Sequence, residues 1–174
     1  VELRPNKGAV IATPAAEDVR QIFAARRLLE IGIIDEACEH CTPEDTASLQ
    51  EIVSRENTAI QSGDRSGAIR LAGEFHVELA RVARNKPIQE LLRQLVAQSS
   101  LALALYEAPG HLLCVDDDHI NIVDAVSVGD ATKSRDLMAE HLAKAEAEMK
   151  LEKPKDNNDL KSVFADVIEN RAGV

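Results

Sequence analysis

Apolar residues recur every three to four positions along most of this chain, and helix start and stop signals separate the stretches with this spacing. Such spacing places one apolar stripe along a helix, whereas a half-buried strand shows strict alternation. Aromatic residues make up only 2% of the sequence, so the core must be built from Leu, Ile, Val and Ala. The pattern predicts an all-α fold, an antiparallel bundle of six or seven helices joined by short loops.

Capping residues and helix breakers place the boundaries of six long helices. Thr13 and Thr42 are each followed by proline, an N-cap followed by a favoured first helical residue, so helices are expected to begin at Pro14 and Pro43. Asp64 and Asp130 are two further candidate N-caps. The mostly apolar fourth helix is expected at the centre of the bundle. The helices are expected at about 14–33, 43–62, 65–84, 88–107, 116–128 and 131–151.

Shorter segments flank the predicted bundle, which spans residues 14–151. Residues 1–13 contain two short extended stretches around a turn signal and predict a β-hairpin. A lone hairpin is barely stable in water, so we expect it to be the remnant of another domain and the sequence to be a fragment. Residues 152–174 predict a charged linker followed by a short amphipathic helix.

The charge and cysteine content exclude several classes of protein. Thirty acidic against 20 basic residues give a formal net charge of −10, the opposite of what nucleic acids and anionic membranes attract. No apolar run could span a bilayer and no signal peptide is evident, so we expect a cytoplasmic protein with no membrane partner. Cys38, Cys41 and Cys114 are an odd number and favour free thiols, the first two in a loop.

Histidines are the strongest candidates for chemistry, because no phosphate-binding glycine loop, nucleophile elbow or zinc-protease motif is present. His40 and His111 fall in predicted loops, whereas His76, His119 and His141 each lie on the apolar stripe of a different helix. A single inward histidine is usually a hydrogen-bonded core residue. Three converging neutral imidazoles would leave nitrogens unpaired, and a divalent cation such as Zn²⁺ or Ni²⁺ would satisfy all three.

Two further positions bear on this predicted site. A carboxylate one turn before His76 would complete the ligand set, but that residue is Ala72, which leaves the position to water or an anion. Arg26 lies on the apolar stripe of the first helix, and a buried guanidinium needs an anionic partner. Glu30, one turn later, is one candidate partner, and a carboxylate ligand held jointly by Arg26 and the metal is the other.

Six short motifs follow one another in a recognisable order between about residues 14 and 150. They are Arg26-Arg27-Leu28-Leu29-Glu30, Thr42 with Glu44-Asp45, Phe75-His76 with Leu79, Asp118-His119 with Ile122, Gly129-Asp130, and His141-Leu142. Together they resemble the FCD domain, the ligand-sensing domain of GntR-type bacterial transcription regulators. Residues 1–9 resemble the wing that closes the winged helix-turn-helix domain of the same family.

The resemblance implies an effector-binding and dimerisation domain with no catalysis of its own. It implies a homodimer that senses a small carboxylate metabolite and binds operator DNA through a missing N-terminal domain. Many relatives hold a metal with three histidines, which His76, His119 and His141 match, and an aspartate, where this chain has Ala72. Arg26 matches a position near the effector pocket. The alternative from another class is a helical-bundle metalloenzyme whose three-histidine site carries an activated water.

Overall fold

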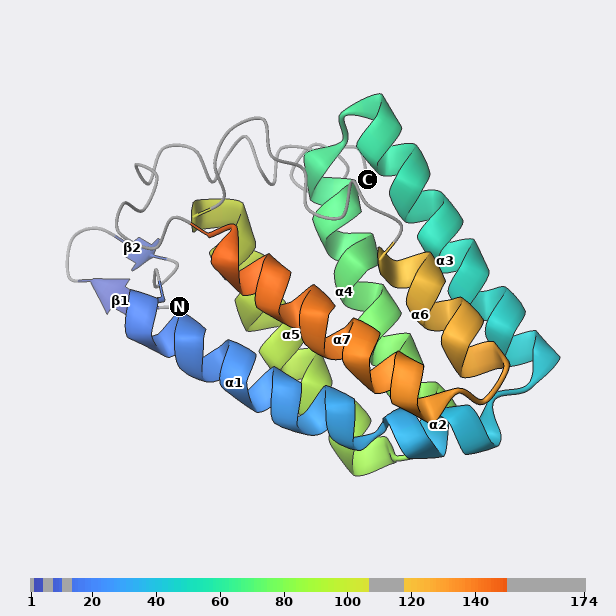
Figure 1. Cartoon of the computed structure of the whole chain (residues 1–174). Coiled ribbons are helices and arrows are strands. Elements are labelled where there is room, and N and C mark those ends of the chain that lie inside the picture. Colours follow the sequence, from blue (N-terminus) through green and yellow to red (C-terminus); the bar gives the residue numbers. More distant parts are fainter. Residues whose placement is uncertain (1, 5–7, 11–13, 107–117, 150–174) are drawn as a thin grey trace.

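The computed structural model describes residues 2–4, 8–10, 14–106 and 118–149, and this part of the chain is a helical bundle (Figure 1). The prediction of an all-α bundle is thereby confirmed. No described helix is long and apolar enough to cross a membrane. The helices are α1 (Ala16–Gly32), α2 (Ile34–His40), α3 (Pro43–Ser62), α4 (Arg65–Val82), α5 (Lys86–Tyr106), α6 (Asp118–Ser127) and α7 (Ala131–Ala147).

Two three-residue strands precede the bundle, β1 (Glu2–Arg4) and β2 (Gly8–Val10). They pair antiparallel, with Leu3 opposite Ala9. Whether they belong to a further domain stays a prediction. The helix expected near the C-terminus, together with His111 and Cys114, lies outside the described residues.

Side-chain caps fix the start of three helices as expected from the sequence. The Thr42 hydroxyl accepts a hydrogen bond from the backbone N–H of Asp45 at 3.1 Å, and the Asp45 carboxylate accepts one from the N–H of Thr42 at 3.1 Å. This reciprocal pair is a capping box, which satisfies two amide donors left over at the start of α3. Asp64 and Asp130 accept equivalent hydrogen bonds at the starts of α4 and α7.

The predicted start of the first helix and the predicted loop after it are both wrong. α1 begins at Ala16 rather than Pro14, and its N-cap residue is Ala15. The Asp18 carboxylate accepts a hydrogen bond from the N–H of Ala15 and so fixes the start of the helix there. Cys38 and His40 lie in the seven-residue helix α2 instead of a loop. A helix of two turns is too short to show a clear periodic pattern, although its inner face is fully buried.

The expectation that the 88–107 helix is central is also wrong, because α4 occupies that place. α4 packs against both α3 and α5, and α2 also contacts it. α5 packs on α4 and α1 but leaves an outer face open, where the Leu91 side chain is 51% exposed. Gly73 brings α4 close to α5, since a Cβ atom there would lie 2.8 Å from a methyl group of Val96. α4, the helix that shares the two most extensive helix–helix contacts, is therefore central instead of the mostly apolar α5.

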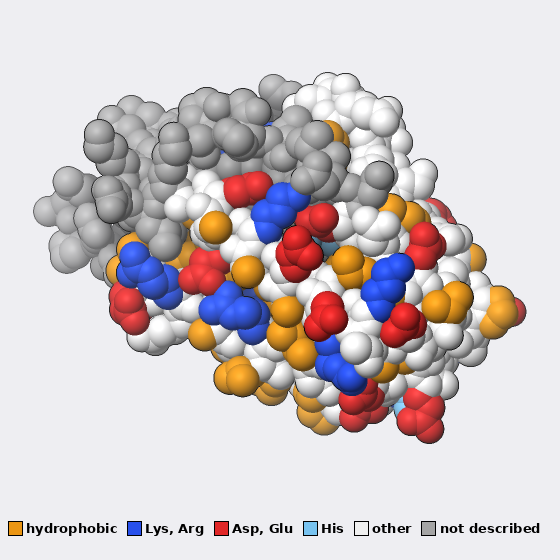
Figure 2. All heavy atoms as spheres, in the orientation of Figure 1, with side chains coloured by type: hydrophobic (Ala, Val, Ile, Leu, Met, Phe, Trp, Pro, Cys, Tyr) orange, Lys and Arg blue, Asp and Glu red, His pale blue; other side chains and the backbone are white. Residues whose placement is uncertain are grey.

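The larger core cluster draws on α2, α3, α4, α5, α6 and α7, and a smaller one joins α1, α5 and α7. Apolar side chains fill both clusters, with Phe75 and Phe23 the largest fully buried ones. A group of polar side chains is nevertheless buried among them. It includes Arg26, Glu30, Glu56, His76, Ser99, His119 and His141. On the surface, acidic, basic and apolar side chains are interspersed over the face seen in Figure 2.

Candidate metal centre

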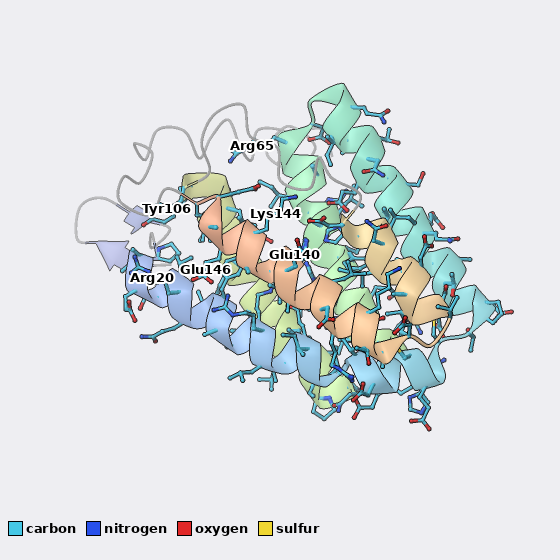
Figure 3. The ribbon with its side chains drawn as sticks, viewed as in Figure 1. Arg20, Arg65, Tyr106, Glu140, Lys144 and Glu146 are labelled. Atoms are coloured by element: carbon cyan, nitrogen blue, oxygen red, sulfur yellow. The ribbon has the colours of Figure 1, made fainter. Side chains whose placement is uncertain are left out.

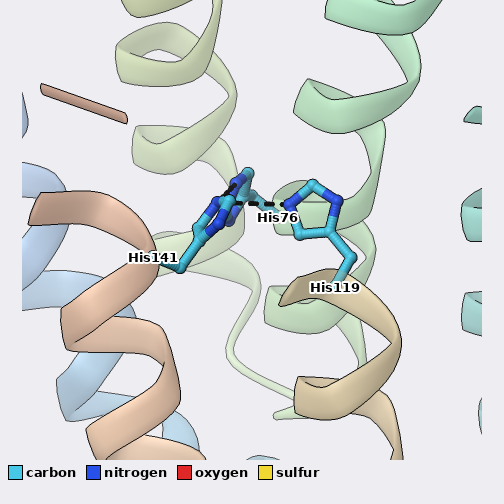
Figure 4. A group of neighbouring side chains, drawn as sticks. All are labelled: His76, His119 and His141. Atoms are coloured by element: carbon cyan, nitrogen blue, oxygen red, sulfur yellow. Dashed lines mark hydrogen bonds between the residues drawn. The ribbon is translucent and has the colours of Figure 1, made fainter. Parts of the chain in front are cut away.

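Three imidazole rings from three helices meet in the interior of the bundle (Figure 4). His76 lies on α4, His119 at the start of α6 and His141 on α7, each at most 4% exposed. The Nε2 atom of His141 lies 3.2 Å from Nε2 of His119 and 3.3 Å from Nε2 of His76. The predicted convergence of these histidines is therefore confirmed, and one ligand atom of each lies within 4.8 Å of the others.

Apolar packing brings the rings together. Phe75, the neighbour of His76 on α4, places its ring centroid 4.2 Å from that of His119. Ile122 and Val126, one and two turns after His119, are fully buried and dock α6 onto the bundle. The helical spacing that buries these residues also turns the histidines inward.

The outer nitrogens of the three rings face carboxylates. Nδ1 of His119 forms a 2.7 Å hydrogen bond with Oε2 of Glu56. Nδ1 of His76 lies 2.6 Å from Oε2 of Glu30. This is a hydrogen-bond distance, but the angles at the two atoms do not meet the geometry of a hydrogen bond. Nδ1 of His141 is 3.5 Å from Oδ2 of Asp118 and has no hydrogen-bond partner among the described residues. Carboxylates at the outer nitrogen are typical of metal-binding histidines.

Burial keeps the rings of His76 and His119 neutral near pH 7. It lowers the pKa of His76 to about 3, although the Glu30 carboxylate acts in the opposite direction. Burial also lowers the pKa of His119 well below its usual value, and the neighbouring His141 adds to the effect. Neutral imidazole is the form that binds a metal, so the rings need lose no proton to become ligands.

The described residues cannot give every nitrogen of the three rings a hydrogen-bond partner. An ionised carboxylate only accepts hydrogen bonds, so Glu56 in its ionised form holds the proton of His119 on Nδ1. The charged Glu30 oxygen 2.6 Å from Nδ1 of His76 favours the proton of that ring on Nδ1 as well. Nε2 of both rings is then a bare acceptor, and His141 between them can donate from Nε2 to one of the two. At least one buried lone pair is left without a donor, which a cation among the three nitrogens would correct.

Comparison with known proteins identifies the bundle. Residues 21–144 match the family model of the FCD domain. The chain belongs to the FCD domain family of GntR-type transcriptional regulators. This FCD domain is 27% identical to the HTH-type transcriptional regulator LutR of Bacillus subtilis over 139 residues, covering 75% of this chain and 61% of that protein. It is 28% identical to the Uxu operon regulator of Haemophilus influenzae over 130 residues, covering 70% and 47%.

Solved structures show the same fold at lower sequence identity. McbR/YncC of E. coli superimposes with a TM-score of 0.64 at 21% identity, covering 75% of this chain and 63% of that one. A GntR-type regulator of Rhodococcus has a TM-score of 0.68 at 21% identity, covering 84% and 70%. The chain spans about half to three fifths of the length of the curated relatives above. Those relatives are transcriptional regulators, not enzymes, which argues against the metalloenzyme alternative.

Arg26 of this FCD domain takes the first of the two partners considered from the sequence. Its Nε atom donates to Oε1 of Glu30 at 2.7 Å and its Nη1 to Oγ of Ser99 at 3.0 Å, while Nη2 has no hydrogen-bond partner in the described part of the chain. Burial alone would raise the pKa of Glu30, but the charge of Arg26 and the contact with His76 lower it to about 2. The contact between Glu30 and His76 joins Arg26 to the histidine cluster, and sequence reasoning did not predict it.

Glu56 is the functional candidate that sequence reasoning missed. It is 2% exposed, and burial raises its pKa to about 7. A signal was present, because Glu56 follows buried Leu49, Ile52 and Val53 by seven, four and three residues and so shares their face of α3. An acidic residue on such a stripe indicates a buried carboxylate with a partner on another helix.

The remaining candidates stand apart from the histidines. Ala72 is half-buried one turn before His76, and no carboxylate of the described chain joins the group of convergent ligand atoms. Cys38 and Cys41 are free thiols, with Cys38 Sγ 3.7 Å from Oγ of Ser134. Figure 3 labels Lys144 on α7, whose Nζ lies 3.5 Å from Oδ2 of Asp118, the same oxygen that faces His141.

Proposed function

We propose that this FCD domain is the effector-binding and dimerisation part of a metabolite-responsive transcription regulator, with one divalent metal ion on Nε2 of His76, His119 and His141. The observation that carries the proposal is the set of three buried imidazoles with their Nε2 atoms turned toward one another. Three imidazoles suit Zn²⁺ and Ni²⁺. The ion would supply a Lewis-acidic centre to which an effector oxygen binds.

The proposed effector is a small carboxylate. Three neutral imidazoles bring no negative charge to a divalent ion, and Ala72 brings none from the position one turn before His76. An anionic effector would provide the missing charge and a further ligand atom. The unpaired Nη2 of buried Arg26 also supports a second contact with an anion, because Glu30 occupies the Nε side of that guanidinium.

The proposed protein is longer than this chain. The two curated relatives extend well beyond the region that matches this chain, and one of them is named an HTH-type transcriptional regulator. We assign residues 1–13 to the remnant of a winged-helix domain and its linker, 14–151 to the effector-binding bundle, and 152–174 to a charged linker with a short helix. Operator binding belongs in this proposal to the N-terminal domain, in a homodimer whose symmetry matches two half-sites.

A metal-dependent ligand screen tests this function. Small organic acids are screened by thermal shift against the Zn²⁺-loaded chain, and the best acid is titrated into loaded and metal-stripped protein. Linkage requires that the acid and the metal each tighten the binding of the other by the same factor. An acid that binds both forms with equal affinity would remove the metal from effector recognition.

A further inference from the structure

Glu56 is a buried carboxylate that has no cationic partner within the part of the chain that the structure describes. Its side chain is 2% exposed, and among the described residues it forms a 2.7 Å hydrogen bond with Nδ1 of His119. In the described part of the chain no lysine or arginine lies at ion-pair distance from Glu56. Glu30, the other buried glutamate beside the cluster, pairs with Arg26 at 2.7 Å. A buried carboxylate with no cation is costly, so some positive charge is expected to come from elsewhere.

The metal centre lies on the opposite side of the His119 ring from Glu56. Nδ1 of this ring faces Glu56, and Nε2 faces His141 at 3.2 Å. Glu56 is not among the convergent ligand atoms, so it would act on a bound ion through His119. The charges nearby are otherwise balanced, because Arg26 offsets Glu30 and Lys144 faces Asp118.

We propose that Glu56 is a positioning residue of the metal centre. Its carboxylate holds His119 with the proton on Nδ1 and Nε2 free for the ion, and it supplies the negative charge that Ala72 does not provide. The inference rests on the metal site proposed above. A carboxylate behind a metal-binding imidazole both orients the ring and increases its basicity, which favours binding of a dication.

Two substitutions of Glu56 separate its charge from its hydrogen bond. Glu56→Gln keeps the shape and an acceptor oxygen but removes the charge, whereas Glu56→Leu removes both. Zn²⁺ affinity of the full chain is measured by competition with a chelator. We expect Glu56→Gln to bind Zn²⁺ about 10-fold more weakly than wild type and Glu56→Leu up to about 100-fold. Glu51→Gln, at an exposed position of the same helix, is the matched control and should bind like wild type.

The tautomer of His119 distinguishes a positioning role of Glu56 from a general packing defect, because a packing defect alone would not change which ring nitrogen carries the proton. In metal-free wild-type protein, at a pH well above the pKa of about 7 of Glu56, the ¹⁵N spectrum of His119 should show the proton on Nδ1. Glu56→Leu should show a mixture of tautomers, with the helix content in circular dichroism unchanged. Ala72→Asp in the Glu56→Gln background should recover the lost Zn²⁺ affinity, because it adds a carboxylate one turn before His76.

The outcomes distinguish this inference from the function on which it rests. Wild-type protein that binds no Zn²⁺ or Ni²⁺ would overturn the metal site itself, and the role of Glu56 with it. Wild type that binds Zn²⁺ while Glu56→Gln binds equally well would overturn the role of Glu56 alone. Weaker binding that Ala72→Asp does not restore, with the tautomer unchanged in Glu56→Leu, would also overturn it.

Discussion

At the scale of single residues, Glu30 connects an ion pair to the histidine cluster. One of its oxygens accepts from Arg26 and the other lies 2.6 Å from Nδ1 of His76, with all three side chains at most 4% exposed. A pair of this kind costs desolvation on both sides, and its two members are tolerated in the core because each cancels the charge of the other. Removing one member should therefore be worse than removing both.

A double-mutant cycle measures that dependence. Arg26→Met should lower the free energy of unfolding by about 3–5 kcal/mol, because Glu30 is left buried without its cation. Arg26→Met combined with Glu30→Gln should cost less than the sum of the two single changes. Urea unfolding of the three variants gives the values. Arg20→Ala, which breaks an exposed pair with Glu17, is the control and should cost at most about 1 kcal/mol. Additive effects at Arg26 and Glu30 would refute the coupling.

The inward histidines were predictable residue by residue, whereas their partners were not. His76, His119 and His141 each lie three or four positions from apolar neighbours, and this spacing alone turns them toward the core. The pairing of Glu56 with His119 joins residues 63 positions apart on different helices. Helical periodicity relates only residues within a few turns of one another. The contact between Glu56 and His119 therefore follows from how the helices pack and cannot be predicted from either stretch of sequence.

At the scale of the helices, local signals succeeded where a helix end is fixed by its own residues. Thr42, Asp64 and Asp130 cap helices through hydrogen bonds to amides three residues later, and each was identified from the sequence. α2 was missed because seven residues give too few repeats for a periodic pattern. The central place of α4 was missed because it depends on which helices pack against which.

Arg84, two residues after the last residue of α4, has a strained backbone conformation that can be tested directly. Its φ angle is 60°, a left-handed value that favours glycine, and its side chain pairs with Asp45 at 2.9 Å while remaining 47% exposed. Arg84→Gly and Arg84→Ala both remove this pair, but only glycine relieves the strain. We expect the glycine variant to be about 1 kcal/mol more stable than the alanine variant in thermal unfolding. Equal stabilities would show that this position stores no strain.

At the scale of the whole molecule, the negative net charge separates effector binding from DNA binding. With a formal charge of −10, the chain repels phosphates. We expect no sequence-selective binding of operator DNA by these 174 residues in a gel-shift assay. Addition of a winged-helix domain at the N-terminus should produce it. Tight, selective binding by the present chain would contradict the division of roles.

The quaternary structure is a second prediction at this scale. A regulator that reads two half-sites needs two-fold symmetry, so we expect a homodimer. Light scattering at micromolar concentration should give a mass of about twice the 18.9 kDa of one chain. A mass equal to one chain at that concentration would count against dimerisation through this domain.

Isothermal titration calorimetry of Zn²⁺ binding to the metal-stripped full chain tests the central claim most directly. We predict one Zn²⁺ site per chain in wild type. His76→Ala should lower the Zn²⁺ affinity by more than the roughly 10- to 100-fold expected for removing a carboxylate that holds a ligand imidazole. Alanine favours helix, so α4 should stay intact, as circular dichroism will show. His40→Ala, at an exposed position of α2, should bind Zn²⁺ like wild type. Wild type without a site, or His76→Ala with wild-type affinity, would contradict the proposed metal centre.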